Sequence, residues 1–142
     1  MATTFPTSRP NWFRIVALLA VLWNAFGVAM YLSSVGMFGD PTAGLSEGER
    51  AAAASIPAWI TGAFAIGTFA GLIGSLGLLL RKKWAQPALI VSLFALLVLE
   101  GWIVFFSGAL DQFGLGVPIM VSAGAILLAW LATHASRRGW LS

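Results

Sequence analysis

One carboxylate stands alone inside a long run of apolar side chains. Residues 97–105 read LVLEGWIVF, and Glu100 is the only ionisable residue in that run. An acid inside a lipid-spanning helix is costly, so its presence suggests a function. Desolvation disfavours the ionised form, and we expect no Lys or Arg at this depth, so Glu100 could exchange a proton for a cationic ligand.

Four other residues are expected near Glu100 if the helices run antiparallel. Asn24 and Tyr31 lie seven residues apart on the first helix, and either could hydrogen-bond the acid. Ser107 falls on the same helical face as Glu100, and Trp102 could supply an aromatic wall that stabilises a bound cation. The predicted ligand site is therefore Glu100, Asn24, Tyr31, Trp102 and Ser107.

A structural role for the same residues is the alternative. A neutral Glu100 bonded to Asn24 or Tyr31 would hold two helices together, because interhelical hydrogen bonds satisfy groups that lipid cannot. For Asn24 taken alone, the structural role is favoured. For Glu100, the sequence leaves both roles open.

Enzyme and metal-site motifs are absent from the sequence. It contains no G-x-S-x-G, no H-E-x-x-H, no P-loop lysine and no pair of carboxylates at helical spacing. The chain has no Cys, and its one histidine, His134, cannot by itself form a histidine-rich metal site. We therefore predict no catalytic residue, no metal and no cofactor.

The elements that carry these residues are predicted to be membrane-spanning helices. Of the 142 residues, 59% are hydrophobic and 9% charged, whereas soluble domains have about 25% charged residues. A helix needs about 20 apolar residues to cross a bilayer. Four segments qualify, and none shows the period-two alternation of a barrel: residues 13–36, 58–80, 87–108 and 116–135. The fold class is therefore all-α, a single four-helix transmembrane domain over residues 1–142.

The basic residues fall on one side of the predicted membrane. Seven of the eight Lys and Arg residues flank the spans on that side: Arg9, Arg14, Arg81, Lys82, Lys83, Arg137 and Arg138. The other side holds four acids and one cation: Asp40, Glu47, Glu49, Asp111 and Arg50. The positive-inside rule then places both termini in the cytoplasm. Membrane topology explains the basic residues better than a nucleic-acid partner does.

The one long connection, residues 37–57, is expected to hold a short helix on the outer face. Ser46 and Glu49 have the spacing of a capping box, which predicts a helix from Glu47 to Ser55. Pro57 would then kink or restart the chain before the second span. This helix either covers an outward-facing pocket or lies at the membrane surface, and the surface position is favoured.

Small residues recur at intervals of three and four in three of the predicted spans. They are Ala17, Ala20, Asn24, Gly27, Tyr31 and Ser34 in the first, Ala63, Gly67, Ala70, Gly74 and Gly77 in the second, and Ser122, Ala125, Ala129, Ala132 and Ser136 in the fourth. Such spacing lets helix backbones approach closely and predicts a left-handed bundle. These faces could join helices of one chain or of two, and packing within one chain is favoured.

Three stretches resemble a group of small bacterial inner-membrane proteins. They are Trp23-Asn24 with Gly27, the run PAWITGAFAIGTFAGLIGSLGLLLRKKWA, and the ending RRGWLS. Members of that group are often catalogued as sugar transporters, and the likeness extends to the broader class of DoxX-like four-helix membrane proteins. The resemblance covers nearly the whole chain. It implies four spans in a bacterial inner membrane and supplies no substrate-binding residues.

Two functions are compatible with these features. The first is binding or transport of a small solute or cation, with Glu100 titrating in an outer-half pocket. One bundle of this size has little room for two gates, so this function implies a homodimer or another membrane-protein partner. The second is a non-catalytic accessory or scaffold subunit that docks on a larger complex through its small-residue faces. The first is preferred, because Glu100 has no simple structural explanation.

Overall fold

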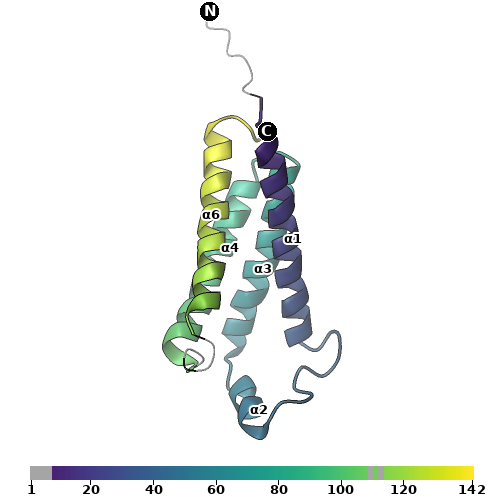
Figure 1. Cartoon of the computed structure of the whole chain (residues 1–142), viewed down its shortest axis with the longest axis vertical. Coiled ribbons are helices and arrows are strands. Elements are labelled where there is room, and N and C mark those ends of the chain that lie inside the picture. The colour runs from purple at the N-terminus through teal and green to yellow at the C-terminus, as the bar shows by residue number, and fades with distance from the viewer. Residues whose placement is uncertain (1–7, 109–110, 112–113) are drawn as a thin grey trace, which may run out of the picture.

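Four long helices and one short helix form the described part of the chain (Figure 1). The computed structural model describes residues 8–108, 111 and 114–142. The helices are α1 (Asn11–Ser34), α2 (Glu47–Ala54), α3 (Ala58–Leu79), α4 (Ala85–Phe106) and α6 (Gly116–Arg137). Each long helix is long and apolar enough to cross a bilayer. The chain is therefore an integral membrane protein with four spans, and the predicted all-α fold is confirmed.

The observed ends of the four spans lie within two residues of the predicted ends. Pro10 and Pro57 occupy the N-cap positions of α1 and α3 with extended backbone, so these two spans begin directly after a proline. Gly36 and Gly139 follow α1 and α6 with φ of 83° and 71°. Glycine adopts this left-handed conformation without a steric penalty, which ends both helices sharply.

The short outer helix forms as its capping sequence predicts. The backbone N–H of Ser46 donates to the Glu49 carboxylate at 2.8 Å, and the backbone N–H of Glu49 donates to the Ser46 hydroxyl at 3.3 Å. This reciprocal pair satisfies two N–H groups at the start of α2. The predicted helix between the first two spans is thus confirmed, and Ser55 is its C-cap.

The four spans form an open arc in the order α1, α3, α4, α6. The central helices α3 and α4 pack extensively on each other, α1 packs on α3, and α6 packs on α4. Figure 1 shows α1 and α6, the two ends of the arc, diverging toward the end of the molecule where α2 lies. A space between α1 and α6 at that end follows from this order.

Glycines on α3 allow its neighbours to approach closely. A Cβ at Gly67 would lie 2.7 Å from Leu96 Cδ2, and a Cβ at Gly74 would lie 2.5 Å from Leu89 Cγ. A Cβ at Gly71 would overlap the side-chain oxygen of Asn24 on α1. The small-residue face of α3 is therefore filled by α1 and α4 of the same chain.

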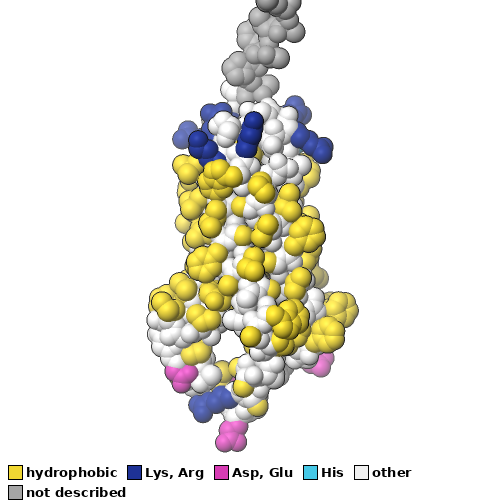
Figure 2. Space-filling model, turned by 180° about the vertical axis from the view of Figure 1, so that it is seen from behind, with side chains coloured by type: hydrophobic (Ala, Val, Ile, Leu, Met, Phe, Trp, Pro, Cys, Tyr) yellow, Lys and Arg dark blue, Asp and Glu magenta, His cyan; other side chains and the backbone are white. Residues whose placement is uncertain are grey.

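Charged residues separate to the two ends of the bundle, as Figure 2 shows. We call one end the basic end, because it carries Arg9, Arg14, Arg81, Lys82, Lys83, Arg137 and Arg138. The opposite end, which we call the acidic end, carries Asp40, Glu47, Glu49, Asp111 and Arg50. The separation of charge predicted from the sequence is thus present in the fold. Which end faces the cytoplasm stays a prediction.

We expect Gly74→Ala to destabilise the bundle, because the new Cβ would lie 2.5 Å from Leu89 Cγ and 3.1 Å from the Leu89 backbone nitrogen. Overpacking of this kind costs about 1–3 kcal/mol. The measurement is unfolding in detergent, and the matched control is Gly62→Ala on the same helix, where a Cβ meets nothing within 4 Å. Equal stability of the two variants would contradict close packing between α3 and α4.

We expect α2 to lose stability in acid. The hydrogen bond from the Ser46 backbone N–H to the Glu49 carboxylate, with a further contribution from the Ser46 side chain, lowers the pKa of Glu49. A lowered pKa means that the ionised carboxylate stabilises α2 above the pKa of an ordinary glutamate, about 4.3. That stabilisation is lost as the pH falls through the lowered pKa. Hydrogen-exchange protection of α2 amides should therefore drop in acid relative to α3.

The capping pair offers its own control. Glu49→Gln should weaken α2 at neutral pH and make its protection less dependent on pH, whereas Glu47→Gln, outside the capping box, should keep the dependence. Protection of α2 that does not change with pH in the unmodified chain would show that the carboxylate does not hold the helix.

Candidate functional site

A cavity of about 920 Å³ lies between the spans toward the acidic end. All five described helices contribute to its wall. The short helix α2 contributes Arg50, Ala53 and Ala54 at the acidic end. The volume falls within the range of about 300–1,000 Å³ that is typical of small-molecule sites. The cavity exists because α1 and α6 lie at the two ends of the arc and do not pack closely there.

Glu100 is buried at the wall of this cavity. Its side chain is 7% exposed, and its Oε2 atom has no hydrogen-bond partner among the described residues. Leu96 and Ile103, one turn before and after it on α4, also line the cavity, so this face of the helix points inward. Glu100 lies six residues before the end of α4 at Phe106, which is roughly 9 Å at 1.5 Å per residue.

Asn24 lines the same cavity and holds two helices together. Its Nδ2 donates to the Ala20 carbonyl at 2.9 Å and to the Ser75 hydroxyl at 3.0 Å, and Ser75 donates to the Gly71 carbonyl at 2.7 Å. The side chain of Asn24 fits because Gly71 has no Cβ. Asn24 therefore joins α1 to α3, which is the structural role favoured from the sequence. Its Nδ2 group donates to Ala20 and Ser75 and not to Glu100.

The other three predicted site residues lie in different surroundings. Trp102 lines the cavity. Tyr31 instead packs edge-on against Phe64 and Phe69, with ring centroids 5.6 and 5.8 Å apart, and is not part of the cavity wall. Ser107 caps the end of α4 and donates to the Ile103 carbonyl at 2.6 Å. The structure thus brings Glu100, Asn24 and Trp102 to one cavity, and their role in ligand binding stays a prediction.

Sequence reasoning did not include Arg50 in the predicted site. Arg50 lies on α2 and is the one Lys or Arg among the residues that line the cavity, and its Nε donates to the Thr42 carbonyl at 3.3 Å. Arg50 is also the one basic residue of the sequence outside the basic end, which could have drawn attention to it. All eight residues of α2 are exposed. The surface position favoured from the sequence stays a prediction, and the residues of α2 that line the cavity are Arg50, Ala53 and Ala54.

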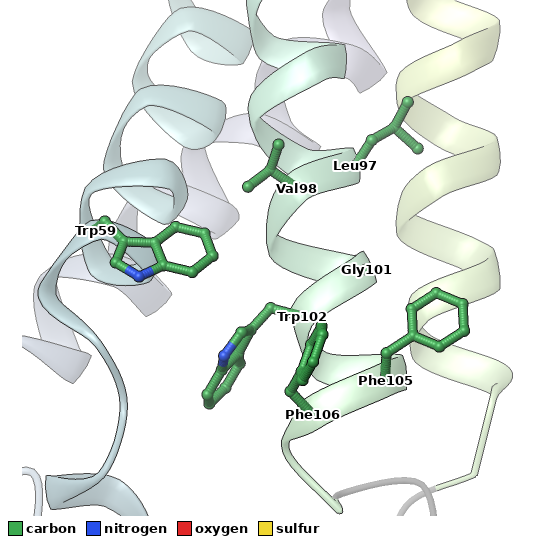
Figure 3. Close-up of a pocket in the computed structure, with 7 residues that line it drawn as sticks. All are labelled: Trp59, Leu97, Val98, Gly101, Trp102, Phe105 and Phe106. Atoms are coloured by element: carbon green, nitrogen blue, oxygen red, sulfur yellow. The ribbon is translucent and has the colours of Figure 1, made fainter.

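A second hollow lies on the outer side of α3 and α4, as Figure 3 shows. It has a volume of about 510 Å³ and lies between Trp59 on α3 and Trp102, Phe105 and Phe106 on α4. Gly101 leaves space there, since a Cβ would meet nothing within 4 Å. All seven lining residues are apolar or aromatic, so this hollow offers no charged group for chemistry.

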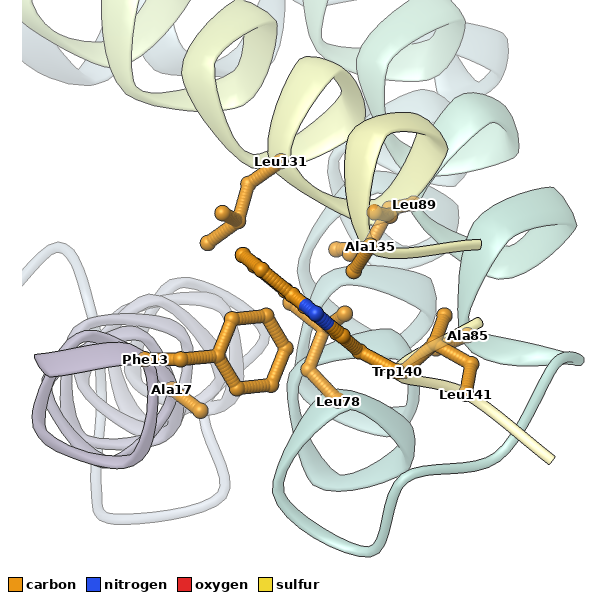
Figure 4. Close-up of a cluster of buried hydrophobic side chains, with 10 residues drawn as sticks. Phe13, Ala17, Leu78, Ala85, Leu89, Leu131, Ala135, Trp140 and Leu141 are labelled. Carbon is orange, nitrogen blue, oxygen red and sulfur yellow. The ribbon is translucent and has the colours of Figure 1, made fainter. Parts of the chain in front are cut away.

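The basic end of the space between the spans is closed. Figure 4 shows Trp140, from the segment after α6, lying among side chains of α1, α3, α4 and α6. Its ring contacts Phe13 edge-on, with centroids 5.5 Å apart. Backbone bonds fix this segment, because Ser142 N–H donates to the Arg81 carbonyl at 2.6 Å and Lys83 N–H donates to the Ser142 carbonyl at 3.1 Å. The cavity is therefore a vestibule that does not continue to the basic end.

Comparisons with protein families, with curated proteins and with solved structures find no match for this chain. The four-span architecture rests on the helices themselves. The resemblance to small bacterial inner-membrane proteins stays a prediction.

Proposed function

We propose that this membrane protein binds a small ligand in the cavity, with Glu100 as the residue that recognises it. The observation that supports the proposal is the position of Glu100 in the wall of a cavity of about 920 Å³, with a buried Oε2 atom that has no hydrogen-bond partner among the described residues. A buried polar group without a partner costs about 1–3 kcal/mol. A ligand that donates a hydrogen bond or carries a positive charge would remove this cost.

The charge distribution supports an orientation for this site. Seven of the eight basic residues lie at the basic end, and loops rich in Lys and Arg remain in the cytoplasm. With both termini inside, the cavity opens toward the outer face of a bacterial inner membrane. The ligand then comes from the outer side of that membrane or from the membrane itself.

Binding has more direct support than transport. The vestibule ends at the aromatic cluster of Phe13 and Trp140, so a ligand at Glu100 could reach the other side only if Trp140 moved. A transport cycle would therefore need the segment after α6 to detach, or a second protein to supply another path. We assign the single chain the binding step.

The scaffold function has less support. It depended on small-residue faces that dock onto another protein, but the glycines of α3 are filled by Asn24, Leu89 and Leu96 of the same chain. Ala129 and Ala132 of α6 are likewise buried. These faces stabilise the bundle itself and leave Glu100 unexplained.

We expect dicyclohexylcarbodiimide to modify Glu100 when the protein is treated in membranes. This apolar reagent adds to protonated carboxyl groups in water-poor sites, and the adduct is located by mass spectrometry of peptides. The exposed acids Asp40 and Glu49 should react little, because hydrogen bonds from Thr42 and Ser46 lower their pKa values and keep them ionised. Glu100→Gln should abolish the modification, whereas the matched control Glu47→Gln should retain it.

The same variants separate a ligand site from a structural role. If Glu100 recognises a ligand, Glu100→Gln should unfold in detergent within about 0.6 kcal/mol of the unmodified protein, the average for interhelical hydrogen bonds in a membrane. A stability loss well above this value, together with no modification of Glu100, would show that the acid holds helices together and that the proposed function is wrong.

A further inference from the structure

The cavity is open on its side, between α1 and α6. Phe26 and Met30 on α1 and Val117 and Met120 on α6 line the cavity, yet each is between 51% and 63% exposed. Side chains that belong both to a cavity wall and to the outer surface mark the edge of an opening. Both helices are membrane spans, so this opening faces the hydrocarbon of the bilayer rather than water.

The opening lies at the depth of Glu100. Met30 and Met120 are each four residues inside the outer ends of their helices, which is roughly 6 Å, and Phe26 is roughly 12 Å inside. Glu100 lies between these depths, roughly 9 Å inside the end of α4. Closer to the basic end the helices approach each other, since the Trp23 ring nitrogen lies 4.0 Å from where a Cβ of Gly124 would be. This contact forms the inner edge of the opening.

The aqueous mouth of the cavity and the opening between α1 and α6 differ in their charged residues. Figure 2 shows the acidic end hollowed near its one cationic residue, and Arg50 and Ala53 of α2 line the cavity there. A guanidinium stays positive at any physiological pH. The exposed acids Asp40, Glu47 and Glu49 lie at the same end, so charged groups of both signs surround the aqueous mouth. No Lys or Arg lines the opening between α1 and α6, which therefore admits an apolar molecule without contact with these charged groups.

The cavity wall sets the chemistry of the occupant. Besides Glu100, Asn24 and Thr68, the deep part of the wall is formed by apolar side chains such as Leu96, Leu99 and Val121, which favour an apolar molecule. A carboxylate pairs best with a cationic donor, and an ammonium offers three N–H groups. Trp23 and Trp102 also line the cavity, and aromatic faces attract cations.

We propose that the ligand is a lipophilic amine that reaches Glu100 from the bilayer through the opening between α1 and α6. The inference rests on the proposed function and adds to it the class of ligand and the route. The ammonium group bonds the Glu100 carboxylate, and the apolar body lies along the cavity wall between the two helices.

The route is tested by comparing two reagents on the protein in membranes. Dicyclohexylcarbodiimide dissolves in the bilayer, whereas a permanently charged, water-soluble carbodiimide does not. We expect the lipophilic reagent to modify Glu100 at least tenfold faster than the charged one. Equal rates would overturn the membrane route and leave the proposed site intact, while no reaction with either reagent would count against the proposed function itself.

Closing the opening gives a second test of the route. The chain has no Cys, so the variant Met30→Cys with Met120→Cys carries only two thiols, which bifunctional thiol reagents of increasing length can bridge. The bridge should slow the reaction of Glu100 with dicyclohexylcarbodiimide at least tenfold. The reference is the same double variant before bridging, and the two single-cysteine variants treated with the same reagents give the effect of thiol modification alone. Met30→Trp with Met120→Trp narrows the same opening without a bridge and should slow the reaction too.

The class of ligand is tested by protection of Glu100 from dicyclohexylcarbodiimide. Dodecylamine should slow the modification at least tenfold, whereas dodecanoate, with a chain of the same length and a negative head group, should not. Equal protection by both compounds would show that the cavity recognises only the chain, and the amine would be ruled out. An unchanged reaction rate in the bridged protein would overturn the route through the opening.

Discussion

The close approach of α1 and α4 to the glycine face of α3 is the constraint on which the rest of the structure depends. Glycines at positions 67, 71 and 74 let the neighbouring backbones come near enough for small polar groups to reach across. Ser92 donates to the Gly67 carbonyl at 2.6 Å, and Asn24 donates to Ser75 at 3.0 Å. Because α3 holds α1 and α4 on two sides and α6 packs on α4, α1 and α6 are left at the open ends of an arc.

The space between α1 and α6 is filled by side chains at the basic end and remains a cavity at the acidic end. At the basic end, Trp140 and Leu141 turn back after Gly139 and lie among the spans, so the space is filled by aromatic and aliphatic groups. At the acidic end, α2 covers part of the space without filling it, and a cavity of about 920 Å³ remains around Glu100. A single packing arrangement thus explains both the closed end and the site.

Much of the fold could be predicted from the sequence, because length and hydropathy decide where a span can begin and end. The start of α2 could also be predicted, because the capping box needs only Ser46 and Glu49, which are three residues apart in the chain. Which spans pack on each other was harder to predict, because hydrophobic burial does not favour one helix pair over another in lipid. Glu100 could be identified from the sequence, because an ionisable side chain inside a membrane span is energetically unfavourable. Its surroundings could not, because the directions of Asn24 and Tyr31 depend on how α1 is rotated against α3.

The docking of Trp140 has a consequence for biosynthesis. This residue follows α6 in the chain, so it leaves the ribosome only after all four spans have been made. Until then, the Phe13 ring of α1 lacks its edge-on contact with Trp140. Closure of the basic end is therefore a late event, because the segment after α6 must fold back onto spans that are already in place.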